Sequence, residues 1–240
     1  MSYTLQQTIN WAQTYVQYIP LTAGTGNEPA ISIGNTVQST ILNAPFVWPF
    51  NRNEFPIVLV TGQQDYVFDV TDFAYLEKVS LLSADGSDGF EVKDVYNTNI
   101  LGLAATGSTA QPNAVAVKLY TPDTSIALRF LSNPDQAYTG TLTYQVIVDP
   151  FTALDDPWAP IPDSFIDIFN NLFLAEVMAV ADDAREQLYR QRGIAALLSK
   201  AEGLTEMQRN VYLAQYLARG SSMTLAAQLR TQQAIQARGL

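Results

Sequence analysis

Cysteine and histidine are both absent from the 240 residues of the chain. A disulfide framework and a metal site built from cysteine or histidine are therefore excluded. The lack of histidine also removes the most frequent general base and the usual activator of a serine nucleophile. From these absences we predict that the protein is not an enzyme and that it uses no cofactor and no metal.

Charged residues are also scarce. They make up 15% of the chain, whereas hydrophobic residues make up 48%, and soluble domains usually contain about 25% charged residues. Because charged residues are depleted at the cores of protein interfaces, the composition indicates extensive contact with other subunits. The alternative is a neutral surface rich in threonine, glutamine and asparagine.

The few charges are unevenly distributed. Residues 1–51 contain one charged side chain, Glu28. Residues 1–183 carry 20 acidic and 5 basic groups, and residues 184–240 carry 3 acidic and 8 basic groups. This asymmetry indicates complementary partners, or subunits that meet head to tail. It argues against a protein that grips nucleic acid over its whole surface.

No long uninterrupted hydrophobic run is present. Polar residues such as Gln6 and Asn10 interrupt the first segment, and the most apolar stretch, residues 165–181, contains Asp167 and Glu176. We therefore expect neither a signal peptide nor a membrane span. The expected protein is soluble and is made in the cytoplasm.

The spacing of hydrophobic residues predicts helices in the first and last parts of the chain. They are expected at residues 4–18, 29–42, 163–192, 194–201 and 204–218. Ser2 or Thr4 is expected to cap the first helix and Pro20 to stop it, while Asp163 is expected to cap the third. Unbroken, the third helix would be about 45 Å long. The apolar face of the last helix contains Leu204, Met207, Val211, Ala214 and Ala218.

Between residues 56 and 150 the hydrophobic period changes to two, which is typical of strands. Alternation is clear at residues 66–70, 115–119, 126–130 and 142–148. Turn signals such as Gly62-Gln63, Asp85-Gly86 and Asn133-Pro134-Asp135 separate these segments. About five to seven short strands of this kind predict a compact antiparallel sandwich or barrel. Residues 98–112 are predicted to form a long loop, with a helical turn at 100–105.

A turn-rich segment with a tryptophan, residues 46–55, joins the helical region to the β region. Gly62-Gln63-Gln64-Asp65-Tyr66 is then expected to form a hairpin, and Ile161-Pro162-Asp163 marks the return to helix. This layout resembles the head-to-tail adaptor (connector) proteins of tailed bacteriophages, in which a G-Q-x-x-Y hairpin often opens the β region. The resemblance spans most of the chain.

Together these observations predict an α+β fold with a discontinuous helical body. Residues 1–55 and 151–220 are expected to form this body from both chain ends, and residues 56–150 to form an inserted antiparallel β-sandwich or barrel-like domain. Residues 221–240 are expected to form an extended C-terminal tail that docks on a partner, in the manner of a helix in a groove. A frayed end is the alternative for this tail.

The resemblance to phage adaptors implies a structural virion protein of the neck. It implies a ring of twelve copies between the portal protein and a downstream tail or nozzle protein. DNA would pass through this ring without specific binding, no membrane would be contacted, and residues 221–240 would face the portal. The alternative is another tail or baseplate component whose β domain binds a carbohydrate or a receptor. A carboxylate-based hydrolase that uses Asp155 is a third possibility.

Several acidic and glycine-rich motifs could carry chemistry, but each also has a structural explanation. Gly24-Thr25-Gly26 lacks the third glycine and the preceding strand of a dinucleotide site. The pairs Asp155-Asp156 and Asp182-Asp183 could act in glycoside hydrolysis, or could shape turns and caps. Asp85, Asp88 and Glu91 could bind a divalent cation through oxygen atoms alone, although their spacing is not that of an EF-hand.

Basic and aromatic residues offer two further candidate sites. Arg185, Arg190 and Arg192 could contact DNA phosphates or an acidic partner, or could favour the negative end of a helix dipole. The aromatic residues near the junctions could stack on bases or sugars, or could fill the space between the helical and β regions. These aromatic residues are Trp11, Phe46, Trp48, Phe50, Phe55 and Trp158.

Overall fold

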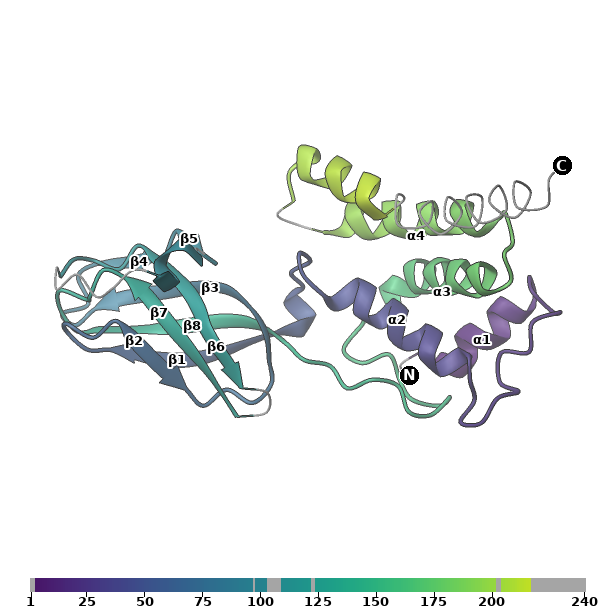
Figure 1. Ribbon diagram of the computed structural model, residues 1–240, viewed down its shortest axis with the longest axis horizontal. Coiled ribbons are helices and arrows are strands. Elements are labelled where there is room, and N and C mark those ends of the chain that lie inside the picture. The colour runs from purple at the N-terminus through teal and green to yellow at the C-terminus, as the bar shows by residue number, and fades with distance from the viewer. Residues whose placement is uncertain (1–2, 97, 103–108, 122–123, 202–203, 217–240) are drawn as a thin grey trace, which may run out of the picture. The chain divides into compact units, whose positions relative to one another are not determined.

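Figure 1 shows the computed structural model of the chain, which describes residues 3–96, 98–102, 109–121, 124–201 and 204–216. The chain divides into two compact units. One, which we call the helical unit, comprises Met1–Phe46 and Asp149–Leu240, and the other, which we call the β unit, comprises Val47–Val148. The tail expected at residues 221–240 lies outside the described residues.

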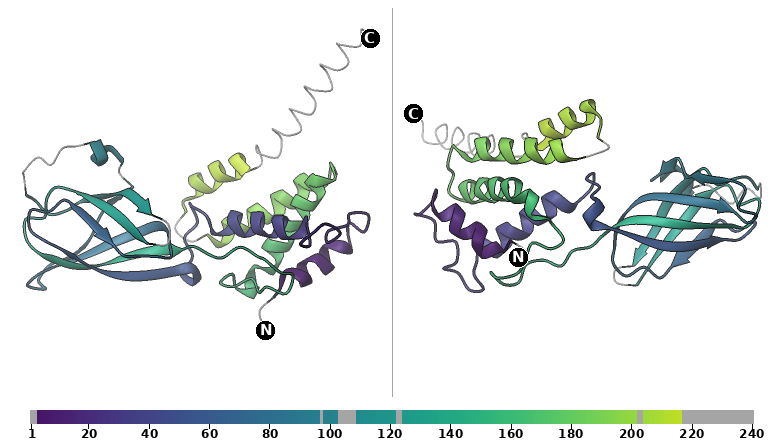
Figure 2. Two further views of the ribbon diagram at one scale, coloured as in Figure 1. Left: turned by 60° about the horizontal axis from the view of Figure 1, so that its bottom comes forward. Right: turned by 180° about the vertical axis from the view of Figure 1, so that it is seen from behind.

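The described part of the helical unit is built from short helices. They are α1 (Leu5–Gln13), α2 (Ala30–Leu42), the 3-10 turn η3 (Asp163–Phe165), α3 (Ile166–Val180) and α4 (Glu186–Lys200), followed by helical residues 206–216. α3 packs against α1, α2 and α4 (Figures 1 and 2). Trp158 stacks on Phe169 of α3, with ring centroids 4.1 Å apart, so α3 is the centre of this core. Within the described residues, every helix is too short or too polar to cross a membrane.

The first two helices form close to where the hydrophobic spacing predicts them. Thr4 is the N-cap of α1, as predicted, and its backbone N–H donates to Oε1 of Gln7 at 3.0 Å. α1 ends at Gln13 rather than at residue 18. α2 confirms the prediction over residues 29–42 to within one residue.

The predicted continuous helix over residues 163–192 is wrong, because a turn at residues 181–185 separates α3 from α4. Asp182 has a left-handed backbone conformation, with φ of 54°. The Oδ1 atom of Asp183 accepts the backbone N–H of Arg185 at 2.9 Å. Aspartate competes with helix by bonding to nearby backbone groups. This local preference outweighs the helical spacing and turns the chain back along α3.

Gly193 lies inside α4, although the sequence predicts that it separates two helices. A Cβ atom at this position would lie 2.7 Å from the side chain of Leu172 in α3. Only glycine therefore allows the two helices to approach so closely. A glycine that serves helix packing has the same appearance in a sequence as a helix breaker.

The β unit contains two four-stranded sheets. Its elements are η1 (Pro49–Asn51), β1 (Arg52–Leu59), β2 (Asp65–Phe68), β3 (Phe73–Ser83), β4 (Gly89–Glu91), β5 (Asp94–Val95), η2 (Thr98–Gly102), β6 (Ala114–Thr121), β7 (Ser125–Leu131) and β8 (Tyr138–Val146). One sheet has the order β1-β8-β3-β4 and is antiparallel, and the other has the order β2-β7-β6-β5, in which β5 runs parallel to β6.

A hydrophobic cluster of buried side chains lies between the two sheets, whose strands are seen in two further views in Figure 2. Ile126, Leu128 and Phe130 of β7 point into it, as their alternation predicts, and all three side chains are fully buried. On the facing sheet, Leu142 and Tyr144 of β8 are also buried in this cluster. The period-two pattern therefore identifies the inward side of the central strands correctly.

The predicted hairpin at residues 62–66 is wrong, because β1 and β2 belong to different sheets. The motif still determines the turn between them. Gly62 has a φ of 81°, and the hydroxyl of Tyr66 accepts the backbone N–H of Val60 at 2.9 Å. The glycine and the tyrosine thus hold the turn at which the chain crosses from one sheet to the other.

The expected fold class is corrected by these findings. The chain is a mixed α/β protein in which a hydrophobic core lies between two sheets, and one of those sheets contains a parallel pair. The 30-residue helix on which the predicted helical body depends is replaced by two 15-residue helices. The β unit begins at Val47, so that most of the segment 46–55 belongs to it, rather than at residue 56.

Gly140 in β8 allows a test of the packing between β8 and β3. A Cβ atom at Gly140 would overlap the backbone carbonyl oxygen of Ser80, whereas one at Gly89 of β4 would make an ordinary contact with Leu82 at 3.5 Å. We expect Gly140→Ala to destabilise the protein by about 1–3 kcal/mol, because a backbone atom must move. Gly89→Ala should change stability by less than about 0.5 kcal/mol. Urea unfolding followed by tryptophan fluorescence measures both, and equal effects would contradict this account.

Candidate functional site

The outward side of the sheet formed by β1, β8 and β3 carries a group of exposed or partly exposed, uncharged side chains. We call this group the neutral face, and its members are Pro56, Val58, Ser80, Leu82, Thr139 and Thr141. Val58 and Leu82 flank Thr139 in the strand register. They are 61% and 43% exposed, respectively. The face therefore combines apolar groups with threonine hydroxyls.

The strand pattern explains how the neutral face forms. Successive side chains of a strand point to opposite sides of the sheet, so the inward positions of Tyr138 and Leu142 place Thr139 and Thr141 outward. Threonine suits such a partly solvated strand. Glu54 and Lys78 flank the next outward residue of β8, so that charges border the neutral face on this side.

The other end of the same outward side is covered by the segment that precedes β1. The backbone N–H of Trp48 donates to Oε1 of Gln145 at 3.0 Å, and Nε2 of Gln145 donates to Oε2 of Glu77 at 3.1 Å. Arg52 donates to the same carboxylate through Nε at 2.8 Å. Gln145 is completely buried, and the ring of Trp48 stacks on that of Phe50 at 5.6 Å. Only the end around Thr139 is therefore open to a partner.

We expect Gln145→Leu to lower the free energy of unfolding by about 1–3 kcal/mol, because the buried N–H of Trp48 and the carboxylate of Glu77 each lose a partner. Thr141→Val, four residues earlier on the same strand, is the matched control and should have little effect. Thermal denaturation followed by circular dichroism measures both variants. A Gln145→Leu protein as stable as the wild type would contradict this role of the amide.

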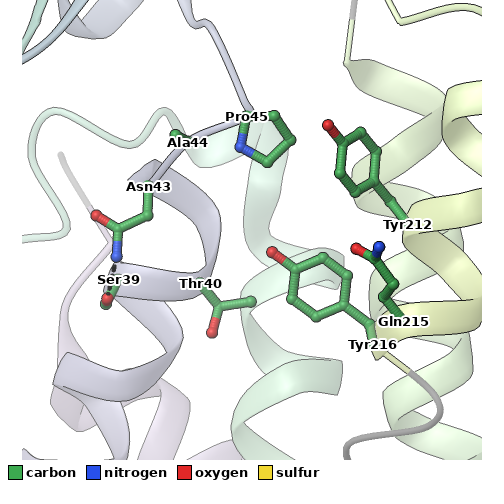
Figure 3. A pocket seen from close by; sticks show the side chains of 8 residues that line it. All are labelled: Ser39, Thr40, Asn43, Ala44, Pro45, Tyr212, Gln215 and Tyr216. Atoms are coloured by element: carbon green, nitrogen blue, oxygen red, sulfur yellow. Dashed lines mark hydrogen bonds between the residues drawn. The ribbon is translucent and has the colours of Figure 1, made fainter. Parts of the chain in front are cut away.

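A second candidate site is a pocket in the helical unit, between the end of α2 and helical residues 206–216 (Figure 3). Its volume is about 350 Å³. Only uncharged residues line it: Ser39, Thr40, Asn43, Ala44, Pro45, Tyr212, Gln215 and Tyr216. Nδ2 of Asn43 donates to Oγ of Ser39 at 2.6 Å, and the ring of Tyr216 stacks on that of Phe46. This chemistry suits a neutral ligand with an apolar face.

The acidic pairs of the sequence act in turns. Oδ2 of Asp156 accepts the backbone N–H groups of Thr152 at 2.7 Å and Ala153 at 2.8 Å, and these bonds lower the pKa of Asp156. Hydrogen bonds from Arg185, first from its side chain and then from its backbone, lower the pKa of Asp183. Local hydrogen bonds therefore favour the ionised form of both carboxylates. The two residues shape turns, which is the alternative to glycoside hydrolysis.

The acidic cluster of the β unit also forms a turn. Oδ1 of Asp85 accepts hydrogen bonds from Oγ of Ser83 at 2.6 Å and from the backbone N–H of Ser87 at 3.0 Å. These bonds lower the pKa of Asp85 to about 2. Asp88 and Glu91 are not brought together with Asp85, since the described residues contain no group of three acidic side chains placed to hold a metal ion.

The glycine pair of the N-terminal region lies in the loop before α2. The backbone N–H of Gly24 donates to the carbonyl oxygen of Glu28 at 3.0 Å, and Gly26 has a φ of 72°. The carboxylate of Glu28 accepts the backbone N–H of Ser32 in the first turn of α2 at 3.2 Å. An acidic side chain thus occupies the helix end at which a phosphate would bind.

The arginines near the start of α4 are largely paired within the helical unit. Arg190 donates to Glu176 at 2.7 Å and to Glu186 at 2.6 Å, and only 18% of its side chain is exposed. Arg185 pairs with Asp183 at 2.7 Å, and the guanidinium of Arg192 lies 5.7 Å from the ring centroid of Tyr189. Arg185 and Arg190 are thus paired with carboxylates, whereas Arg192 is exposed and keeps its charge.

Three of the large aromatic residues of the junctions, Phe46, Trp48 and Trp158, are core residues, whereas Trp11, Phe50 and Phe55 are partly buried. Trp158 is fully buried in the helical unit, and Trp48 is 3% exposed in the β unit. Trp11 is partly buried and packs against Tyr15 at a centroid distance of 4.9 Å. Buried rings fill space inside the units and cannot stack on a ligand, since a ring must be exposed to stack on a base or a sugar.

The predicted apolar face of residues 204–218 is exposed rather than buried. Met207 and Val211 are 77% and 45% exposed, whereas Tyr212 and Tyr216 are partly buried beside the pocket. Sequence spacing identifies which residues share a face of a helix but not which face meets the core. Residues 217 and 218 lie outside the described residues.

The second sheet carries a group of paired charges. Asp65 of β2 accepts hydrogen bonds from Arg129 at 2.7 Å and from Lys118 at 2.7 Å, and Nη1 of Arg129 also donates to the carbonyl oxygen of Leu101 at 3.0 Å. The bonds from Arg129, together with Lys118, lower the pKa of Asp65 to about 2. Neither the pairing of these residues nor the neutral face was predicted, since both depend on which strands are neighbours.

Acid unfolding should report this ion pair. The folded-state pKa of Asp65 lies below the unfolded value of about 3.9, so the pair adds stability above about pH 4 and loses it as the pH falls toward 2. We expect the stability of the wild type to fall more steeply over this range than that of Asp65→Asn. Asp69→Asn, at an exposed position nearby, is the control and should follow the wild type. Parallel curves for all three proteins would refute the assignment.

No known protein family matches the chain, and no curated protein matches it either.

Proposed function

We propose that the protein is a structural component of a tailed-bacteriophage virion. In this proposal it is a head-to-tail adaptor, and twelve copies form a ring between the portal protein and a downstream tail or nozzle protein. DNA passes through the channel of the ring without specific binding.

The observation that carries this proposal is the exposure of large apolar side chains in both units. Val58 and Leu82 are exposed on the β unit, and Met207 and Val211 are exposed on the helical unit. Apolar surface gains free energy when it is removed from water. In a chain with only 15% charged residues, such positions suit contacts with several neighbours, as a ring component requires.

The charge distribution supports passage of DNA without adhesion. Residues 1–183 carry a net charge of −15, and Arg185 and Arg190 are engaged with acidic side chains. Affinity for duplex DNA comes mainly from cations that neutralise phosphates. A channel wall of this composition would therefore repel the phosphate backbone. Residues 221–240 are proposed to contact the portal.

Mass photometry of the full chain, alone and with the portal protein of the same virus, tests the proposal. We expect a species of about twelve times 26.4 kDa, formed alone or on the portal. A chain that lacks residues 221–240 should keep its circular dichroism spectrum but bind the portal at least about tenfold more weakly, since a docking segment contributes directly to affinity.

Two results would count against the adaptor. One is a chain that joins no larger particle in the presence of portal. The other is tight retention of duplex DNA by the assembled ring in a filter-binding assay at low salt, where electrostatic binding is strongest.

A further inference from the structure

We propose that two copies of the chain associate through the neutral face, about a two-fold axis that lies between them and runs along β8. This contact goes beyond the proposed ring. A two-fold contact closes at two copies, whereas a ring requires head-to-tail contacts between different surfaces. The contact would pair individual copies, or copies of two facing rings.

The strand register makes the neutral face complementary to itself. β1 and β3 lie on either side of β8 at the strand spacing of about 4.8 Å, and Val58, Thr139 and Leu82 share one row across them. Rotation about an axis along β8 exchanges the two sides. Val58 of one copy then faces Leu82 of the second copy, and Thr139 faces its own counterpart. In the next row, Pro56 faces Ser80.

The same rotation also brings together oppositely charged residues at the border of the neutral face. Glu54 and Lys78 flank Thr143 in one row. Neither Glu54 nor Lys78 forms a salt bridge with any residue in the described ranges. The rotation places Glu54 of each copy opposite Lys78 of the other. Opposite charges meet twice, which fixes the orientation of the pair.

A second copy suits this surface better than a charged partner does. The chain carries a net charge of −10, so two copies repel each other over most orientations. The neutral face is a region where this repulsion is small and where apolar groups can be buried. Facing sheets pack about 10 Å apart, with their strand directions within about 30° of each other. Because the contact spans only three short rows, an angle of this size between the two sheets still keeps the facing residues together.

The expected association is weak. Three rows across three strands form an area below the standard interface of about 800 Å² per partner. We therefore expect a dissociation constant on the order of 10⁻⁵ M. Sedimentation velocity of the full chain should show conversion from 26.4 kDa to twice that mass as concentration rises through this range. A wild-type chain that stays monomeric at about ten times this concentration would overturn the proposal.

Exchange of the border charges tests the orientation. Glu54→Lys and Lys78→Glu each replace two attractive pairs by two repulsive ones, so each should raise the dissociation constant about tenfold. The double variant, with the charges swapped, keeps the wild-type net charge and should restore the affinity. Leu82→Arg should abolish association. Circular dichroism and thermal unfolding confirm that each variant is folded.

Glu91→Lys is the matched control for net charge. Glu91 lies on β4, beyond Ser80, and faces no residue of the second copy under the proposed rotation. Its substitution should leave the dissociation constant within about threefold of the wild type, since exposed charges outside a contact contribute little. If net charge alone decided the affinity, Glu54→Lys and Glu91→Lys would both strengthen association and Lys78→Glu would weaken it. That pattern would falsify the proposed geometry.

The absence of native cysteine allows a second, independent measurement. Thr139 meets its own counterpart only in a two-fold contact, so Thr139→Cys should be crosslinked to a dimer by a bis-maleimide that spans about 10 Å. In Glu91→Cys the two thiols would lie roughly 20 Å apart, at four strand spacings, and should not react. A ring that forms without a Thr139→Cys crosslink would overturn this inference and leave the proposed function intact.

Discussion

The β unit depends on the hydrogen bonding of β8 to strands on both of its sides. β8 joins β1 and β3, both of which lie far from it in the sequence, into one antiparallel sheet. Its inward side chains, such as Leu142, complete the core. Its outward side chains face two different environments: Gln145 is buried by the segment before β1, whereas Thr139 is exposed. One strand therefore contributes both to the core of the unit and to an exposed surface of it.

Ion pairs within each unit control how much charge the surface presents. Glu77 pairs with Arg52, Asp65 pairs with Arg129, and Glu176 pairs with Arg190. Several of the few basic residues of the chain are therefore engaged in ion pairs within their own unit. These ion pairs reduce the number of basic groups left for phosphates, which favours association through apolar and hydroxyl groups.

The sequence predicted individual elements better than their arrangement. The spacing over residues 29–42 and the alternation in β7 identified a helix and a strand, since burial in both follows the local period. The helix over residues 163–192 was overextended because two aspartates stop it through local hydrogen bonds. β3, the longest strand, was not predicted, because charged residues and a bulge near Lys78 interrupt its alternation. The neutral face could not be foreseen, since it exists only once β1 and β3 are placed beside β8.

The β unit begins and ends on paired strands. Arg52, at the start of β1, lies opposite Gln145, near the end of β8. Chain entry and chain exit are therefore neighbours, about one strand spacing apart. A module with adjacent ends can be removed from a gene and replaced by a short bridge, or exchanged for an unrelated module, with little disturbance of the host chain. Recombination could thus diversify this part of the protein while the residues on either side of it continue to evolve under their own constraints.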